Sequence, residues 1–277
     1  MDKQEVLKEY RKTEDRILLS QVLDKIEIAE KRNQIQYTDF LDMYQVALVK
    51  KFLNKNQLQN YILYGGFEDA ERKIAIFYSD NYDKEIVEKD YQKMLKVIRV
   101  QLGKDEIGKY THRNYLGGII KLGMKREKVG DILVADDGAD IIVKEETAKI
   151  LSKDLETLTR FQNSKVDVID LSDLRTPEIK VEEIDIIVPS LRLDNIASDL
   201  ARTSRSKIVQ VMAQERVFIN GQCETKPSKA VKMGDVITIR GKGCGRRHGN
   251  VKENPYGKTQ SCDHRPWYGE PAGQQCG

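Results

Sequence analysis

Residues 190–214 read SLRLDNIASDLARTSRSKIVQVMAQ, a pattern that predicts two short helices joined by a basic turn. Apolar residues recur every three or four positions in the first half, which is the spacing of one helix face: Leu193, Ile196, Ala197 and Leu200. Ser204 is a typical N-cap for a second helix over residues 205–214, because its hydroxyl can accept a hydrogen bond from a free backbone N–H. The buried face of this second helix is expected to hold Ile208, Val209 and Met212.

Two strands are predicted after the helix pair. Residues 217–221 are an apolar run that enters an Asn-Gly turn, and residues 234–239 are a second such run. Together with the two helices, these strands predict a small α+β domain over residues 188–243.

Basic residues gather at the start and at the turn of the helix pair. The N-terminus of a helix presents unpaired backbone N–H groups that suit a phosphate, and arginine side chains add charge and paired hydrogen bonds. We therefore expect RNA phosphates to be bound by Arg192, Arg202, Ser204, Arg205 and Lys207, with Arg205 as the principal contact. The alternative is a structural role, in which Arg205 only pairs with a nearby carboxylate such as Asp199.

The charge of the chain supports a nucleic-acid partner for this domain. Lys and Arg number 32 against 36 Asp and Glu over residues 1–189, 10 against 5 over residues 190–243, and 5 against 3 over residues 244–277. A basic segment in a nearly neutral chain is the electrostatic pattern of a nucleic-acid-binding module.

The sequence gives no sign of membrane insertion or export. No apolar stretch approaches the ~20 residues of a membrane-spanning helix, and the N-terminus lacks the apolar core of a signal peptide. All four cysteines follow residue 222. We therefore expect a cytoplasmic protein without membrane contact.

Residues 1–84 are predicted to form a small α+β domain. Helices are expected over residues 6–31 and 39–52, followed by strands over residues 60–67 and 73–78. The glycine pair at residues 65–66 favours a turn. A phosphate-binding loop is the alternative, but the Lys-Ser/Thr pair of such loops is missing.

Residues 85–182 are predicted to form a ferredoxin-like middle domain. The expected elements follow the order strand, helix, strand, strand, helix, strand, over residues 95–100, 114–122, 131–135, 140–143, 147–159 and 166–169. RNA-recognition modules share this order and stack bases on aromatic residues of the central strands. Because the strands here are rich in Ile, Leu and Val, base stacking on this sheet is not expected.

A polar segment in the middle domain is a second candidate RNA contact. Its basic residues could meet phosphates from one side of the domain: Arg113, Lys121, Lys125, Arg126 and Lys128. The alternative is a helix cap at Thr111 or Asn114 followed by solvated lysines. His112 has no second histidine or cysteine nearby, so neither metal binding nor acid–base chemistry is expected there.

Several spaced motifs resemble known families. The motifs at residues 192–194, 204–207, 217–221 and 232–236 are similar to the RNA-binding domain named after small-subunit ribosomal protein S-four. Residues 1–243 as a whole resemble the YlmH family of bacterial proteins, through residues 65–72, 112–117 and 123–131. The resemblance implies a ribosome-associated factor that binds ribosomal RNA on the large ribosomal subunit, with tRNA as a further candidate partner. It also implies links to rescue of stalled nascent chains and to cell division.

The tail, residues 244–277, departs from that family. It holds three of the four cysteines, two of the three histidines and the only tryptophan. So abrupt a change of composition is typical of a segment translated after a frameshift. Where a further strand would complete the S-four-like domain, we expect disorder instead. The alternative is a zinc site, because thiolates and imidazoles are good zinc ligands: Cys244, His248, Cys262, His264 and Cys276.

Three classes of function follow from these observations. The first is a monomeric, non-enzymatic RNA-binding factor without catalytic residues, metal or cofactor. The second is an RNA-modifying protein similar to pseudouridine synthases, which often carry the same kind of small S-four-like domain and whose catalytic segment contains Arg-Leu-Asp. Here residues 192–194 lack the following Thr-Ser-Gly, and residues 1–189 are too short for that catalytic domain. The third is a cell-division scaffold with protein partners.

Overall fold

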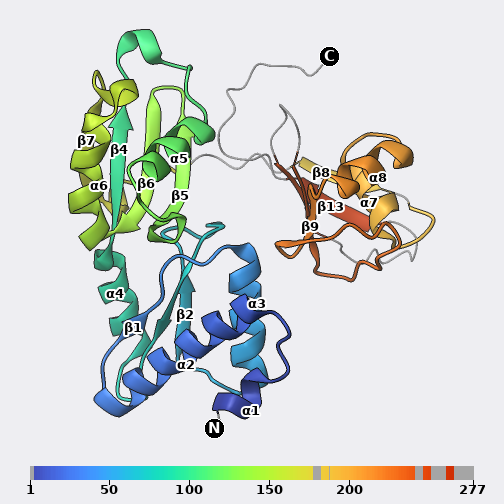
Figure 1. The fold of residues 1–277 in the computed structure, drawn as a ribbon, viewed down its shortest axis with the longest axis horizontal. Helices are drawn as coiled ribbons and strands as arrows, with labels where there is room; N and C mark the ends of the chain where they lie inside the picture. Colours follow the sequence, from blue (N-terminus) through green and yellow to red (C-terminus); the bar gives the residue numbers. More distant parts are fainter. Residues whose placement is uncertain (1–2, 177–181, 187, 241–245, 251–259, 265–277) are drawn as a thin grey trace. The chain divides into compact units, whose positions relative to one another are not determined.

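The computed structural model describes residues 3–176, 182–186, 188–240, 246–250 and 260–264 (Figure 1). These residues belong to two units, Met1–Thr176 and Pro177–Gly277. Both units combine helices with antiparallel sheets, which confirms the expected α+β class. No helix in the described ranges is long and apolar enough to cross a membrane.

The first part of unit 1 packs helices around a three-stranded antiparallel sheet of order β1-β3-β2. Its elements are α1 (Lys3–Leu7), α2 (Thr13–Arg32), β1 (Gln36–Tyr37), α3 (Met43–Lys55), β2 (Tyr61–Tyr64) and β3 (Ile74–Phe77). The helix predicted over residues 6–31 is interrupted after Leu7, where Tyr10 packs against Phe52 of α3 with 6.1 Å between the ring centroids.

The helix predicted from residue 39 begins only at Met43, because Asp42 forms a capping box. The Asp42 carboxylate accepts a hydrogen bond from the Gln45 backbone N–H, and the Gln45 side chain accepts one from the Asp42 backbone N–H, both at 2.9 Å. Residues 38–41, just before the cap, instead form hydrogen bonds with β3 and the residue that precedes it. The Thr38 N–H donates to the Ala75 carbonyl, and the Leu41 N–H donates to the Lys73 carbonyl.

The glycine pair at residues 65–66 leads into the turn over residues 67–70, where the Ala70 N–H donates to the Phe67 carbonyl at 3.3 Å. A methyl group added at Gly65 would lie 2.3 Å from the Arg72 carbonyl oxygen, and Gly66 has a φ of 105°, which other residues rarely adopt. The predicted turn is therefore confirmed.

The second part of unit 1 has the predicted ferredoxin-like topology. Its elements are α4 (Lys84–Met94), β4 (Leu95–Gln101), η1 (Lys104–Glu106), α5 (His112–Lys121), η2 (Arg126–Lys128), β5 (Val129–Ala135), β6 (Gly138–Lys144), α6 (Glu145–Thr157), η3 (Thr159–Phe161), β7 (Lys165–Asp170) and η4 (Leu171–Asp173). The sheet order is β5-β6-β4-β7, with every pair antiparallel. Helices α5 and α6 pack on one face of this sheet (Figure 1). Helix α4 was not predicted.

The two parts of unit 1 each have an apolar core of their own, and a third apolar cluster joins them. Phe40 and Ile74, from the first part, pack with Leu95 of β4 and Ile142 of β6. The boundary expected at residues 84/85 therefore falls inside one unit.

Arg72 also connects the two parts of unit 1. Its guanidinium donates to the Phe40 and Val129 carbonyls, both at 3.0 Å, and to the Arg126 carbonyl at 3.3 Å. The buried Asp131 carboxylate accepts from the backbone N–H groups of Glu71 and Arg72. The acidic run that ends at Arg72 is thus a structural connector.

Unit 2 contains the predicted helix pair and a four-stranded antiparallel sheet of order β10-β9-β11-β12. Its elements are β8 (Glu182–Ile186), α7 (Leu193–Leu200), α8 (Arg205–Ala213), β9 (Val217–Ile219), β10 (Gln222–Cys223), β11 (Val236–Arg240), β12 (Arg246–Asn250) and β13 (Gln260–His264). Asn220 and Gly221 have φ values of 49° and 78°, so the predicted Asn-Gly hairpin turn is present.

The core of unit 2 is close to the predicted one. Leu193, Ile196, Ala197 and Leu200 of α7 pack with Ile208 and Met212 of α8. Val209 was also expected to be buried, and this was wrong: it is 36% exposed, while Val211 packs against the core instead.

Two segments of the tail form strands. β12 pairs with β11 and β13 pairs with β8, both antiparallel. The expectations of disorder throughout residues 244–277 and of a missing further strand are therefore wrong for these segments, because backbone pairing does not require the apolar pattern used to predict strands. The rest of the tail, and the side chains of the alternative zinc site, lie outside the described residues.

We expect Arg72→Ala to lower the free energy of unfolding by about 3 kcal/mol, because partly buried carbonyl acceptors lose charge-assisted hydrogen bonds. Arg72→Lys should recover only part of this loss, since one ammonium cannot reach carbonyls on both sides of the guanidinium. Urea unfolding of the full chain measures the change, with Lys73→Ala as the matched control. Equal stability of the Arg72→Ala and Lys73→Ala proteins would contradict the connector role.

Candidate nucleic-acid interface

The two helices of unit 2 have different N-termini. At the start of α7, the Leu193 N–H donates to the Lys229 carbonyl at 2.9 Å, and the Asp194 N–H donates to the Pro227 carbonyl at 3.1 Å. At the start of α8, Ser204 is the N-cap and accepts from the Lys207 N–H at 3.3 Å. The structure describes no partner for the backbone N–H groups of residues 205 and 206. The N-terminus of α8 is thus the one suited to a phosphate.

A buried carboxylate holds the two principal arginines beside this N-terminus. Asp194, in the first turn of α7, is only 2% exposed. Arg192 donates to it through Nε and Nη2, both at 3.0 Å. Arg205 of α8 contacts the same carboxylate through Nε at 2.7 Å and Nη2 at 2.6 Å. The two guanidinium groups therefore converge on a single point of unit 2.

The electrostatics of this cluster keep Asp194 ionised. Burial by itself would raise the pKa of Asp194, but hydrogen bonds from Arg192 and Arg205 hold it below the usual value of a carboxyl group. The side chains of Arg192 and Arg205 remain 41% and 53% exposed. The structure describes no contact for Nη1 of either arginine, so each can still donate to a phosphate.

The other predicted residues of unit 2 lie at the same turn. Arg202 has a φ of 48°, and its N–H donates to the Asp199 carbonyl at 2.9 Å, which closes the turn between the helices. Lys207 is exposed in the first turn of α8. Arg205 does pair with a nearby carboxylate, as the structural alternative expected, but the partner is Asp194 and not Asp199.

Sequence reasoning did not name Asp194 as part of the candidate site. Asp194 follows Leu193, the first residue of the apolar stripe, and it was considered only as part of the helix and of the motif at residues 192–194. The sequence offered one indication: the carboxylate of Asp194 lies two residues after Arg192, a candidate RNA contact. An acidic residue inside the first turn is also common for helix-dipole reasons, so that signal alone did not indicate a buried ion pair.

The candidate residues of unit 1 divide between exposed and structural positions. Arg113 in α5 and Lys125 after it are exposed. Arg126 is half-buried, and its Nη1 donates to the carbonyls of Val129 at 2.6 Å and Gly130 at 2.9 Å. Arg126 is therefore at least partly committed to holding the start of β5, which the sequence did not indicate.

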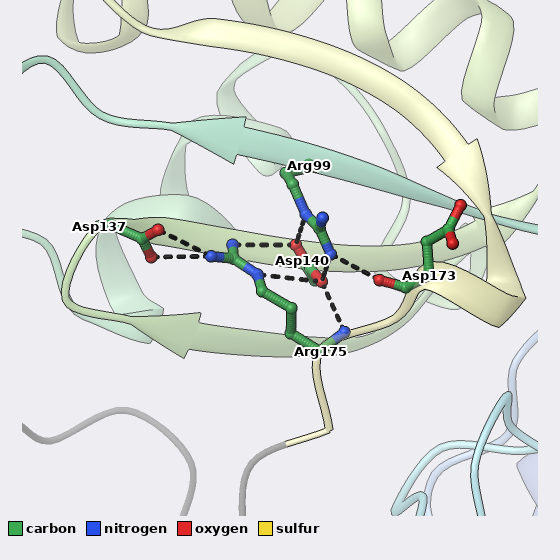
Figure 2. A network of polar contacts seen from close by, with 5 residues as sticks. All are labelled: Arg99, Asp137, Asp140, Asp173 and Arg175. Atoms are coloured by element: carbon green, nitrogen blue, oxygen red, sulfur yellow. Dashed lines mark hydrogen bonds and ion pairs between the residues drawn. The ribbon is translucent and has the colours of Figure 1, made fainter.

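The face of the sheet opposite α5 and α6 is covered by an ion-pair network (Figure 2). Asp140 of β6 is 1% exposed, and Arg99 of β4 donates to its two oxygens at 2.8 and 2.7 Å. Arg175 donates to Asp140 and also to Asp137 at 2.8 Å, while Arg99 reaches the Asp173 carbonyl at 2.7 Å. The segment around residues 173–175 thus crosses the position where RNA-recognition modules stack bases.

No described group of three or more His, Cys, Asp or Glu side chains is placed to hold a metal ion. The described chemistry at the turn between α7 and α8 is that of guanidinium, ammonium and backbone N–H donors around one ionised carboxylate. This arrangement can bind phosphate oxygens.

Two family descriptions match the chain in these regions. Residues 87–173 match "Putative RNA-binding domain in YlmH", and residues 191–237 match "S4 domain". The first region contains the ferredoxin-like sheet with α5 and α6. The second contains the helix pair, β9 and the start of β11.

Similar proteins have related descriptions. The chain is 31% identical over 239 residues to the ribosome-associated protein quality control protein P2 of Bacillus subtilis, covering 86% of this chain and 90% of that protein. Small ribosomal subunit protein uS4 of Lachnospira eligens is 46% identical over 59 residues, which are 21% of this chain and 29% of that protein. A solved structure described as cell division protein ylmH from Streptococcus pneumoniae is 17% identical, with a TM-score of 0.47, over 60% of this chain and 98% of that chain.

The sequence similarity to the Bacillus subtilis protein extends through both units, and the two family matches fall on the two parts of the chain that carry the candidate RNA contacts. The chain therefore belongs to the YlmH family of bacterial RNA-binding proteins, with an S4 domain in its C-terminal unit.

Proposed function

We propose that this protein is a non-enzymatic factor that binds ribosomal RNA on the large ribosomal subunit and acts in the quality control of stalled nascent chains. The observation that carries the proposal is the pair of half-exposed arginines, Arg192 and Arg205, fixed by the buried Asp194 beside the open N-terminus of α8. Transfer RNA bound to the same subunit is a further partner in this proposal.

The geometry supports phosphate binding because the arginines are positioned before any ligand arrives. A long, flexible side chain loses conformational freedom when it is immobilised on binding, which opposes association. Here the ion pairs with Asp194 have already restricted both guanidinium groups. The remaining Nη1 donors and the α8 N-terminus then offer a phosphate several hydrogen bonds at one place.

The ribosomal part of the proposal is supported by the relatives. The Bacillus subtilis protein is described as ribosome-associated and as a quality control protein, and the Lachnospira eligens protein belongs to the ribosome itself. The non-enzymatic part is supported by the two matching family descriptions, which name RNA binding and the S4 domain.

We expect the full chain to sediment with large ribosomal subunits from Bacillus subtilis and not with the small subunits. Separated subunits are mixed with the protein and centrifuged through sucrose, and the protein in each pellet is measured. Preferential sedimentation with small subunits would refute the proposed binding site on the ribosome. Crosslinking and sequencing of the RNA in the pellet then distinguishes ribosomal RNA from tRNA.

We expect Arg205→Ala to reduce the affinity for large subunits about tenfold, since a charge-assisted contact with phosphate is lost. The dependence of log affinity on log salt should become shallower by about one unit. Arg205→Lys should also weaken binding, because an ammonium cannot both hold the Asp194 carboxylate through two nitrogens and donate to a phosphate.

Arg216→Ala is the matched control for Arg205→Ala. Arg216 follows the C-terminal end of α8 and contacts the Gln214 side chain at 3.3 Å, away from the N-terminus of the helix. Its removal should leave affinity and salt dependence unchanged. If both Arg205 variants bind large subunits like the unaltered protein, while thermal unfolding shows them folded, Arg205 is not a phosphate contact.

We expect Asp194→Asn to weaken both folding and RNA binding, because it removes the charge that positions the two arginines. The folded pKa of Asp194 is depressed, so its stabilising contribution is present above the usual carboxyl pKa and is lost as the pH falls through the folded value. The difference in unfolding free energy between the unaltered and Asp194→Asn proteins should therefore stay constant above about pH 5 and shrink as the pH falls below the usual carboxyl pKa of about 3.9. Urea titrations at several pH values measure it, and a difference independent of pH would contradict an ionised Asp194.

A further inference from the structure

The polar segment of unit 1 is free of carboxylates over a long stretch. Between Ile107 and Arg126 the chain has five basic residues and no Asp or Glu: Lys109, Arg113, Lys121, Lys125 and Arg126. The whole of residues 1–189 has more acidic than basic residues. Helix α5 lies at the centre of this stretch.

Helix α5 has one apolar face and one basic face. Tyr115, Gly118 and Ile119 are buried, and the two large side chains pack in the core beneath the helix. Four other residues of the helix are exposed: Arg113, Gly117, Ile120 and Lys121. Arg113 is followed by the other three after four, seven and eight positions, which places all four on one face of the helix. Ile120 is 47% exposed, although it is a large apolar side chain. No described element covers this face.

The two adjacent glycines of α5 have different explanations. A methyl group added at Gly118 would lie 3.0 Å from Leu158 and 3.3 Å from Phe161, so the packing of the core requires a glycine there. A methyl group added at Gly117 would meet no atom within 4 Å. Glycine destabilises the interior of a helix relative to alanine, and no contact among the described residues requires it at position 117.

We propose that this face of α5 binds the sugar–phosphate backbone of RNA, with Arg113 and Lys121 on phosphates and Gly117 allowing close approach of the backbone between them. The missing side chain at Gly117 opens a shallow gap one helical turn from each cation. Ile120 then offers an apolar contact to a ribose. The second part of unit 1 thus contacts RNA through a helix rather than through its sheet.

One observation favours RNA over a protein partner, and a second favours the helix over the sheet as the contact surface. The exposed side chains of the face carry two positive charges with no carboxylate in the surrounding stretch, which complements a phosphate backbone. The usual alternative surface of this fold is occupied by Asp140, Arg99 and Arg175 (Figure 2). The proposal rests on the proposed function, because it assumes that the partner of the protein is an RNA.

The test uses the full chain and large ribosomal subunits from Bacillus subtilis as the probe. Gly117→Ala should raise the thermal midpoint by about 2–4 °C, because alanine favours the helix. The same substitution should lower the affinity for large subunits several-fold, and Gly117→Gln should lower it further. A change that strengthens folding and weakens binding separates a binding role from a structural one.

Lys121→Ala provides the electrostatic part of the test. It should weaken binding and make the salt dependence shallower by about one unit. Lys153→Ala is the matched control, because Lys153 is an exposed lysine in the middle of α6 on the same unit. It should change neither quantity.

The outcomes separate this proposal from the proposed function. If Arg205→Ala weakens binding while Gly117→Ala and Lys121→Ala bind normally, the α5 contact is refuted and the proposed function stands. If Gly117→Ala weakens binding but Lys121→Ala affects neither affinity nor salt dependence, the face contacts protein, and the RNA assignment is overturned. Normal binding by all three variants would refute both the α5 contact and the Arg205 contact, whereas the proposed function itself is refuted only if the unaltered protein fails to sediment with large subunits.

Discussion

A carboxylate that is buried and shared by two arginines is the constraint on which the candidate RNA interface depends. Asp194 lies in the first turn of α7, yet it holds Arg205 on α8 as well as its near neighbour Arg192. A buried charge without partners is strongly unfavourable, so the two arginines stabilise the folded helix pair by compensating the charge of Asp194. The surface that we assign to RNA is therefore set by the core of unit 2.

The same chemistry has a different consequence in unit 1. Asp140 is also buried and also shared by two arginines, Arg99 and Arg175. Arg175 pairs with Asp137 as well, and the segment before it covers the sheet (Figure 2). In unit 2 the arginine–carboxylate cluster positions two guanidinium groups at the surface that we assign to RNA. In unit 1 a similar cluster covers the sheet face on which RNA-recognition modules stack bases. For this reason we place the RNA contact of unit 1 on α5.

The sequence predicted more of the fold than of the site. The order of strands and helices in residues 95–170 followed from apolar spacing, and the topology followed from that order. The end points were less accurate, as the start of α3 at Met43 shows, because a cap depends on one hydrogen-bonded pair of side chains. Among the candidate RNA contacts, Arg126 also donates to carbonyls at the bend into β5, a structural role that no spacing rule describes.

The sequence by itself determined the two helices around Ser204, the concentration of basic residues near them, and the ferredoxin-like order of unit 1. These features depend on charge and on spacings of two to four residues along the chain. Only the tertiary structure decided that Asp194 joins two arginines, that Arg72 connects the two parts of unit 1, and that Gly118 is required by packing while Gly117 is not. These contacts join residues far apart in the sequence or depend on the shape of a packed surface, and neither is encoded in any local pattern.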